Sequence, residues 1–275
     1  MFYLLIFSGC HREREITKED NGLPELSLSL EEDRVVAGNP VGYQAVLSWS
    51  DGRAERVFAD FSSDLEGTLR TEGETLTPTI AGDQQVTATV LYGESTFSDT
   101  KLLHVHAADP TSLDLRLNAA QTQAGNPLTL SVSAQDRYGN PVLTDATTFS
   151  VSDPAVVVVS PGVTATIPGV YTLTATLNSI SDSESFRVVS GDAVDVELTL
   201  SDTDLELYET AVAETRVWDA YDNLIDVQPE LTVSGGQHEI VGDAITFEEE
   251  GWYTVTATVD GVDDTVGPFL IDSTG

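Results

Sequence analysis

Residues 169–176, GVYTLTAT, decide the fold of this chain. The stretch returns at residues 251–258 as GWYTVTAT, and a weaker copy, QQVTAT, stands at residues 84–89. Apolar side chains alternate with threonines in each copy, which is the period of two expected of a strand with one buried face. One strand repeated three times predicts three copies of a small β-domain.

Other landmarks repeat at nearly the same distance. The sequence AGNP at residues 37–40 returns 87 positions later at 124–127, and DRYGN at 136–140 returns 83 positions later as DAYDN at 219–223. The spacings predict three modules, at residues 26–107, 109–190 and 192–272. Because linkers of a few residues restrict bending, we expect three sandwiches of about 35 Å each to form a rod on the order of 100 Å.

The composition indicates folded modules with an acidic surface. Hydrophobic residues make up 40% of the 275 residues, which is enough to fill real cores, and the formal net charge is −34. Nucleic acid and anionic membrane surfaces are not expected as partners, because both attract basic patches. Residues 191–275 alone hold 21 acids and one base, a net charge of −20. One interpretation is a solvated acidic face, and another is divalent cation binding.

The first ten residues, MFYLLIFSGC, form an apolar run that ends in small residues and the only cysteine. They resemble a bacterial lipoprotein signal peptide, with Ser8-Gly9-Cys10 at the small-residue and cysteine positions. The resemblance implies a signal at residues 1–9 and a lipid on Cys10, which makes the membrane a partner through this anchor. It places the protein in the bacterial cell envelope, at the outer membrane or cell surface. The alternative is a buried apolar segment with an incidental cysteine.

Residues 10–25 are charged and lack apolar periodicity, so they predict a flexible tether. The modules that follow fit a seven-stranded immunoglobulin-like sandwich by their length and their frequent turn signals. Tyr171 and Tyr253 stand two positions after a glycine, as at the entry to the sixth strand of such sandwiches. There a tyrosine hydroxyl bonds back to the preceding corner. In the first module Gln84 takes this place.

The repeats resemble bacterial Ig-like domains, the tandem modules of invasin and intimin and of many surface lipoproteins. The sequence DRYGNPV at residues 136–142 matches the strand end, Gly-Asn turn and next strand start of that family. DAYDNLI at residues 219–225 matches with Asp222 in place of the glycine. The resemblance implies an all-β fold of three tandem Ig-like β-sandwich domains, and spacer, adhesion or carbohydrate-binding functions.

Catalytic motifs are not found in the sequence. It holds no nucleophile elbow, no His-Glu-x-x-His, no phosphate loop and no dinucleotide glycine pattern, so we expect a protein that is not an enzyme. His104 and His106 share one strand face, as half a metal site or as an exposed strand end. The tryptophans Trp49, Trp218 and Trp252 are candidates for stacking on sugars or, as members of alternating strands, for the core or an interface.

The acidic turn of the third module carries the only constellation with metal chemistry. Asp219, Asp222 and Asp226 fall within eight residues, and calcium takes six to eight oxygen ligands in irregular loops. These three side chains are therefore the candidate calcium ligands. Asp and Asn are also ordinary turn formers, because their side chains bond their own backbone. A turn without metal is the alternative.

The sequence thus predicts a non-enzymatic, surface-anchored lipoprotein whose Ig-like modules act as spacer, adhesion or interaction domains, with a protein or glycan partner at the cell surface. One alternative is a calcium- or glycan-binding module centred on the third domain. The other is the non-catalytic N-terminal part of a larger secreted enzyme.

Overall fold

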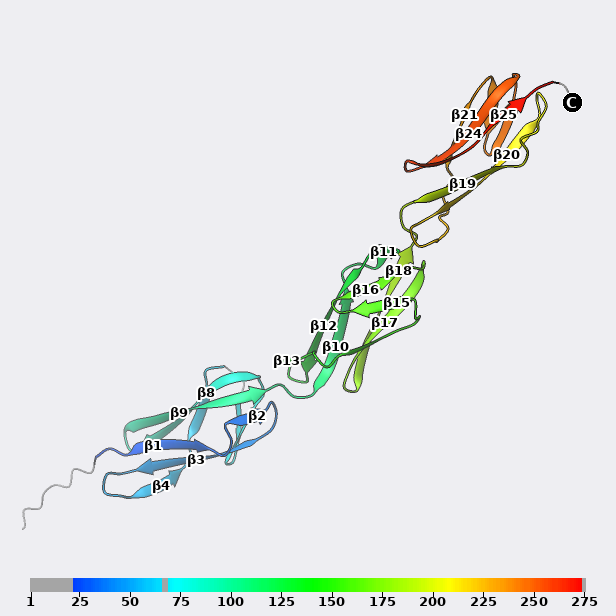
Figure 1. The fold of residues 1–275 in the computed structure, drawn as a ribbon. Helices are drawn as coiled ribbons and strands as arrows, with labels where there is room; N and C mark the ends of the chain where they lie inside the picture. The colour runs from blue at the N-terminus through cyan, green and yellow to red at the C-terminus, as the bar shows by residue number, and fades with distance from the viewer. Residues whose placement is uncertain (1–21, 66–68, 274–275) are drawn as a thin grey trace, which may run out of the picture. The chain divides into compact units, whose positions relative to one another are not determined.

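The computed structural model describes residues 22–65 and 69–273, and every regular element within them is a β-strand (Figure 1). The predicted signal, Cys10 and most of the predicted tether lie outside the described residues. Within these ranges, no helix has the length and apolar character needed to cross a membrane. The described chain divides into two compact units. One comprises the residues up to Thr111 together with Gln135–Val142, and the other comprises Ser112–Ala134 and the residues from Leu143 onward.

The first unit contains a two-sheet sandwich. One sheet has the strand order β1 (Glu25–Leu30), β3 (Val41–Ser48), β7 (Thr75–Pro78) and β6 (Leu69–Glu72), with β4 (Ala54–Val57) also paired to β3. The other sheet has the order β2 (Arg34–Val36), β9 (Ser95–His106), β8 (Gly82–Tyr92) and β5 (Asp60–Ser63). Between them lies a core in which Leu28, Leu47, Leu76 and Leu103 are fully buried.

The strands that follow repeat this order. One sheet of the second module runs β10 (Pro110–Leu117), β12 (Leu128–Asp136), β16 (Gly162–Ala165) and β15 (Val156–Val159), with β13 (Pro141–Val142) beside β12. Its other sheet runs β11 (Gln121–Gln123), β18 (Ile180–Val189), β17 (Gly169–Leu177) and β14 (Thr148–Val151). Leu115, Val163, Leu173 and Phe186 are buried between the two.

The third module has the same plan with a shorter second sheet. Its first sheet runs β19 (Asp195–Leu200), β20 (Thr210–Trp218), β23 (Ala244–Phe247) and β22 (His238–Val241). The second sheet runs β21 (Glu230–Ser234), β24 (Gly251–Val259) and β25 (Val262–Ile271). A parallel bridge from Glu206 to Asp272 stands where β2 pairs with β9 and β11 with β18. The core holds Ile245, Phe247 and Ile271.

The repeated strand is confirmed as a strand with one buried face. Along β17 every second residue is buried, starting at Tyr171, and β24 has the same pattern starting at Tyr253. The strand β8 alternates in the same way after Gln84. Each of these strands pairs with the one that follows it as an antiparallel hairpin, so the threonines lie on the outer face.

The predicted corner bond is also confirmed. Tyr171 donates its hydroxyl hydrogen bond to the carbonyl of Ile167 at 2.7 Å, and Tyr253 donates to the carbonyl of Glu249 at 2.7 Å. Gln84, which is fully buried, donates from its side-chain amide to the carbonyl of Ile80, also four residues earlier. The first module therefore keeps the corner bond without the phenol ring.

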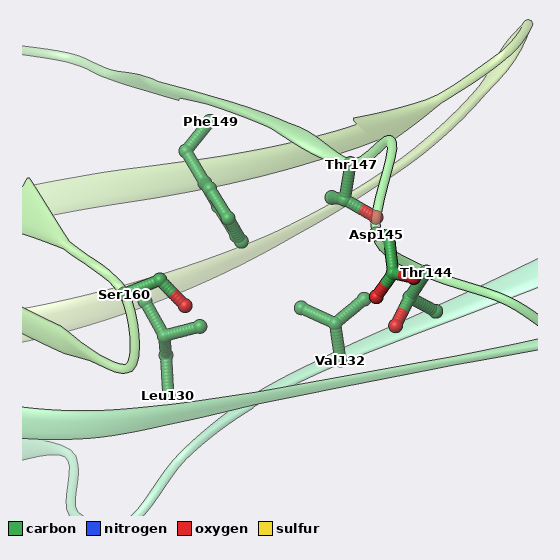
Figure 2. Close-up of a pocket in the computed structure, with 7 residues that line it drawn as sticks. All are labelled: Leu130, Val132, Thr144, Asp145, Thr147, Phe149 and Ser160. Carbon is green, nitrogen blue, oxygen red and sulfur yellow. The ribbon is translucent and has the colours of Figure 1, made fainter.

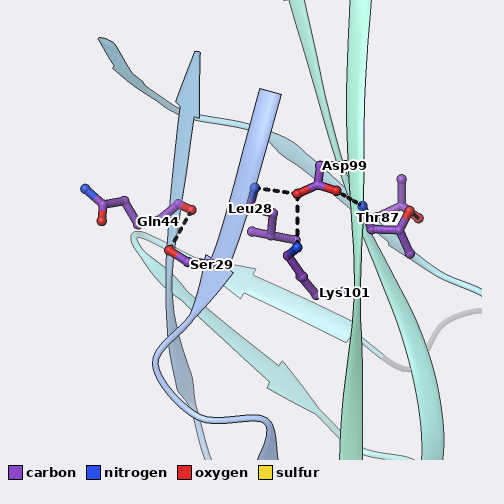
Figure 3. A network of polar contacts seen from close by, with 7 residues as sticks. Leu28, Ser29, Gln44, Thr87, Asp99 and Lys101 are labelled. Carbon is purple, nitrogen blue, oxygen red and sulfur yellow. Dashed lines mark hydrogen bonds and ion pairs between the residues drawn. The ribbon is translucent and has the colours of Figure 1, made fainter. Parts of the chain in front are cut away.

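An aspartate ties the two sheets of each module together, a feature that the sequence analysis missed. Asp99 of β9 accepts a hydrogen bond from the backbone N–H of Leu28 in β1 at 2.7 Å (Figure 3). The same bond joins Asp182 to Leu115 and Asp264 to Leu198, each at 2.8 Å. Since β1 and β9 belong to different sheets, the carboxylate closes one side of the sandwich.

Candidate functional site

Two five-residue loops, residues 136–140 and 219–223, carry the acidic turns singled out in the sequence. In the first, the Asp136 carboxylate accepts from the backbone N–H groups of Tyr138 (2.8 Å) and Asn140 (2.9 Å). The backbone N–H of Asp136 donates to the Asn140 carbonyl at 3.0 Å, and Gly139 turns the chain with φ of 83°. The aspartate thus folds its own turn, as short polar side chains do. We name these two loops the joint loops.

The second joint loop repeats this geometry. Asp219 is 2% exposed and accepts from the backbone N–H groups of Tyr221 (2.8 Å) and Asn223 (3.0 Å). Asp222 has φ of 60° at the place of Gly139, a conformation that Asp adopts more readily than most side chains. Both loops therefore depend on a buried carboxylate at their first position.

The pKa of both buried carboxylates is lowered. Burial alone would raise the pKa of Asp136, but hydrogen bonds from the Asn140 side chain and from three backbone N–H groups outweigh it. The same balance lowers the pKa of Asp219, whose strongest donor is the side chain of Asn223. These donors stabilise the charged form, so both groups are carboxylates at neutral pH.

In the first compact unit the joint loop binds the end of the first sandwich. Asp136 accepts from the N–H of Ala108 at 2.9 Å. The Asn140 side chain donates to the carbonyl of Thr79 at 2.9 Å and accepts from the N–H of Ala81 at 2.8 Å. The amide therefore satisfies a backbone acceptor and a backbone donor that no strand pairing reaches.

In the second compact unit the other joint loop binds the end of the second sandwich. Asp219 accepts from the N–H of Gly191 at 2.7 Å, and Asn223 donates to the carbonyl of Thr166 at 2.7 Å. Pro168 stands where the first module has Ala81 and has no N–H to donate. Ser190 adds a hydrogen bond of 3.2 Å from its hydroxyl to the Leu224 carbonyl.

Each joint loop also places a tyrosine against a glycine of the preceding module. Gly38 and Gly125 have φ of 84° and 80°, and a Cβ added to either would overlap the ring of Tyr138 or Tyr221. Glycine is thus required twice, for its left-handed backbone and for the space that the ring fills. We name Gly38 and Gly125 the glycine seats. This contact explains the glycine of the repeated AGNP sequence.

The candidate calcium ligands are not gathered around one point. Asp219 is buried and holds its loop together, whereas Asp222 and Asp226 are exposed. Within residues 22–65 and 69–273, no three side chains of His, Cys, Asp or Glu are placed to hold a metal ion. The hydrogen bonds favour the turn interpretation of the loop, and calcium binding by these residues stays the alternative interpretation.

The other candidate residues have separate surroundings. His104 lies 2.6 Å from a carboxylate oxygen of Asp83, and His106 is exposed. Trp49 is half-buried, stacks edge-on with Tyr92 at 5.5 Å and lies under the Arg53 guanidinium at 5.0 Å. Trp218 is half-buried in β20. By contrast, 63% of Trp252 is exposed, which excludes the core for this residue and leaves an interface or sugar stacking as its predicted roles.

The second module has a hollow of about 370 Å³ on its side, lined by apolar residues that include Leu130 and Phe149 and by polar residues that include Thr147 (Figure 2). In the first module Tyr43 stands at the position of Leu130, and its ring packs on Phe61 at 4.4 Å. Leu130 is smaller than tyrosine, so the second module leaves open the space that the Tyr43 ring fills in the first module. The hydroxyl oxygen of Thr147 is buried there without a hydrogen-bond partner among the described residues.

Comparison with models of protein families and with curated proteins gave no match. Solved structures are similar in fold. The Escherichia coli adhesin FdeC is 16% identical, with 93% of this chain and 99% of the FdeC chain covered at a TM-score of 0.60. InvD of Yersinia pseudotuberculosis is 16% identical, with 89% and 97% covered at a TM-score of 0.54.

Protocadherin gammaB7 is 12% identical, with 91% of this chain and 78% of that chain covered at a TM-score of 0.51. Likenesses at such identities establish fold and nothing further. The β-strand order, the corner bond and these likenesses agree, and the predicted fold class is confirmed: the chain is an all-β protein of tandem Ig-like sandwiches.

Proposed function

We propose that this protein is a non-enzymatic, lipid-anchored protein of the bacterial cell surface, and that its Ig-like modules serve in adhesion. The observation that carries the proposal is the likeness to the adhesin FdeC over nearly the whole length of both chains. The amino-terminal resemblance to a lipoprotein signal, with Cys10 as the lipidated residue, supports the proposed anchor.

The second joint loop, which lies within one compact unit together with the module it contacts, supports a role in holding neighbouring modules in register. A spacer that holds a binding surface away from a membrane works best when its joints resist bending. Here the second joint loop adds hydrogen bonds to the buried Asp219 carboxylate and from the Asn223 amide, and packs Tyr221 on the glycine seat Gly125. Such contacts exceed what a linker of a few polar residues provides.

Two measurements test the proposal. Cell fractionation should find the full chain with the membranes and the Cys10→Ser chain released from them. Display of the full chain on a non-adherent bacterium should raise the number of cells that attach to a host-cell monolayer. Retention of the Cys10→Ser chain in membranes would contradict the anchor, and unchanged attachment would contradict adhesion.

A further inference from the structure

The end of the third module that corresponds to the glycine seats carries a tyrosine. The N–H groups of Gly38 and Gly125 donate to the carbonyls of Pro78 (2.6 Å) and Ala165 (2.9 Å), and Tyr208 makes the equivalent bond to Phe247 at 2.8 Å. Tyr208 keeps the left-handed backbone, with φ of 72°, and its side chain is 69% exposed. The Tyr208 side chain occupies this place, so the tyrosine of a joint loop could not pack here as it packs on Gly38 and Gly125.

The rim of this end differs in charge as well. The residues that receive a joint loop are Thr-Ile-Ala at 79–81 and Thr-Ile-Pro at 166–168, and the third module has Glu-Glu-Glu at 248–250. Glu206 and Glu209 stand on either side of Tyr208, and all five glutamates are exposed. Because a joint loop carries its own carboxylate, this rim would repel it.

Two further large side chains lie exposed at the same end. Trp252 and Leu270 face each other across β24 and β25 and are 63% and 44% exposed. Val170 is the counterpart of Trp252 in the second module, and there it lines a hollow together with Leu224 of the following loop. A side chain at this position therefore faces whatever binds the end of the module.

We propose that this end is a binding face for a protein surface rich in lysine and arginine. The end face comprises Tyr208, Trp252 and Leu270 and the glutamates at 206, 209 and 248–250. Tyrosine and tryptophan are enriched where binding energy concentrates, and both attract cations over their rings. The only lysine or arginine within residues 191–275 is Arg216, which lies 3.8 Å from Glu197, and His238 lines a hollow beside Glu248 and Glu249. No lysine or arginine of this range therefore pairs with the glutamates of the face, which favours an external cationic partner. The inference rests on the proposed adhesive function and names the class of partner.

Two cationic proteins, lysozyme and cytochrome c, serve as probes of the full chain in titration calorimetry, with their succinylated forms as charge-reversed controls. We expect at least one of the two to bind in its unmodified form only. The double variant Tyr208→Gly/Trp252→Val gives the end face the residues of the second module, and should weaken that binding about tenfold or more. Glu→Gln changes at positions 248–250 should weaken it comparably.

A matched control removes three acids at the other end of the same strands. The triple variant Asp243→Asn/Asp260→Asn/Asp263→Asn changes the net charge as much as the triple glutamate variant, and should leave affinity within about twofold once salt screens the distant charges. If the two triple variants weaken binding equally, or if the Tyr208→Gly/Trp252→Val change has no effect, the attraction comes from the net charge of the whole molecule and the proposal is overturned.

Three other results would also overturn it. These are no binding of either unmodified probe, self-association of the full chain that Tyr208→Gly abolishes, and binding of the neutral sugar maltohexaose at Trp252. Circular dichroism of each variant shows that the fold is kept. Failure of this inference can be told apart from failure of the proposed function, because fractionation and cell attachment are measured without these probes. If the full chain is membrane-anchored and adhesive, and the end-face variants promote cell attachment as well as the parent does, only this inference is overturned.

Discussion

At the scale of single residues, the corner tyrosine combines a ring that fills the core with a hydroxyl that satisfies a corner carbonyl. Tyr171→Phe removes only the bond to Ile167 and should lower the free energy of unfolding of the second module by about 1 kcal/mol. Tyr171→Ala also removes the ring and should cost about 3–5 kcal/mol. Hydrogen exchange of the β17 amides reports on this module within the full chain. Equal costs of the two changes would contradict a packing role for the ring.

A glycine seat can be tested against a glycine that lacks a neighbour. Gly125→Ala meets both a left-handed backbone and the Tyr221 ring, whereas Gly93→Ala meets a left-handed backbone with open space around it. The backbone cost is about 1–2 kcal/mol in both, and overpacking adds about 1–3 kcal/mol at Gly125. The measurement is urea unfolding, with amide exchange at Gly191 as a local probe.

The double variant Gly125→Ala/Tyr221→Ala separates the backbone cost of the alanine from the overpacking cost against the Tyr221 ring. If the ring causes the additional cost, removing it should recover part of that cost, so the two changes should be non-additive. Strict additivity would mean that the tyrosine does not press on the seat.

At the scale of the element, the joint loops should make stability sensitive to acid. The lowered pKa of Asp136 and Asp219 means that the native state binds protons less readily than the unfolded chain. The stabilisation is therefore fully present above the unfolded pKa of about 3.9 and is lost as the pH falls below it through the lower native pKa. Asp219→Asn should flatten this part of the pH profile and, at neutral pH, cost about 1–3 kcal/mol.

Asp222→Asn is the matched control, because this side chain is exposed on the same loop. Thermal unfolding between pH 2 and pH 7 gives the profiles of all three chains. A profile for Asp219→Asn as steep as that of the parent would show that its carboxylate does not hold the loop.

The elements themselves could be read from the sequence, because a strand with one buried face leaves a period of two and a repeat leaves a constant spacing. The partners of Asn140 and Asn223 could not, since they are backbone atoms of Thr79, Ala81 and Thr166, and a carbonyl or N–H carries no sequence signal. For the same reason Asp219 was open to two interpretations: a carboxylate that binds calcium and one that binds N–H groups are the same residue type.

The aspartates that join the two sheets of each module could have been found from the sequence, because they recur with the repeat. Asp182 and Asp264 are 82 positions apart, which is the spacing of the repeated strand between the second and third modules, so alignment of these two modules brings them together. Asp99 is 83 positions before Asp182, whereas the strand copies of the first two modules are 87 apart, so this match also needs a longer hairpin in the first module. The seat contacts needed the structure. They bring Gly38 to Tyr138 and Gly125 to Tyr221, across about a hundred residues each, where nothing in the local pattern marks a pair. The predicted module boundaries stay predictions.

At the scale of the whole molecule, the net charge of −34 should make stability depend on ionic strength. Repulsion among acids falls as salt screens them, so added sodium chloride should raise the unfolding temperature, most of all for the third module. Because N–H groups already occupy the Asp219 carboxylate, we expect millimolar calcium chloride to match sodium chloride of the same ionic strength. Scanning calorimetry of the full chain makes this comparison.

The remaining question is whether calcium recruits the two exposed aspartates of the second joint loop. Asp222→Ala and Asp226→Ala leave the bonds of Asp219 in place, so neither change should unfold the loop. An ion bound at a hundred times its dissociation constant stabilises the native state by about 2.7 kcal/mol, well above the screening difference between matched salts. A calcium shift of that size, lost in both variants, would establish the predicted site and contradict the turn interpretation. Identical shifts in the parent and in both variants would leave the acidic face as a solvated surface whose charge acts only through its field.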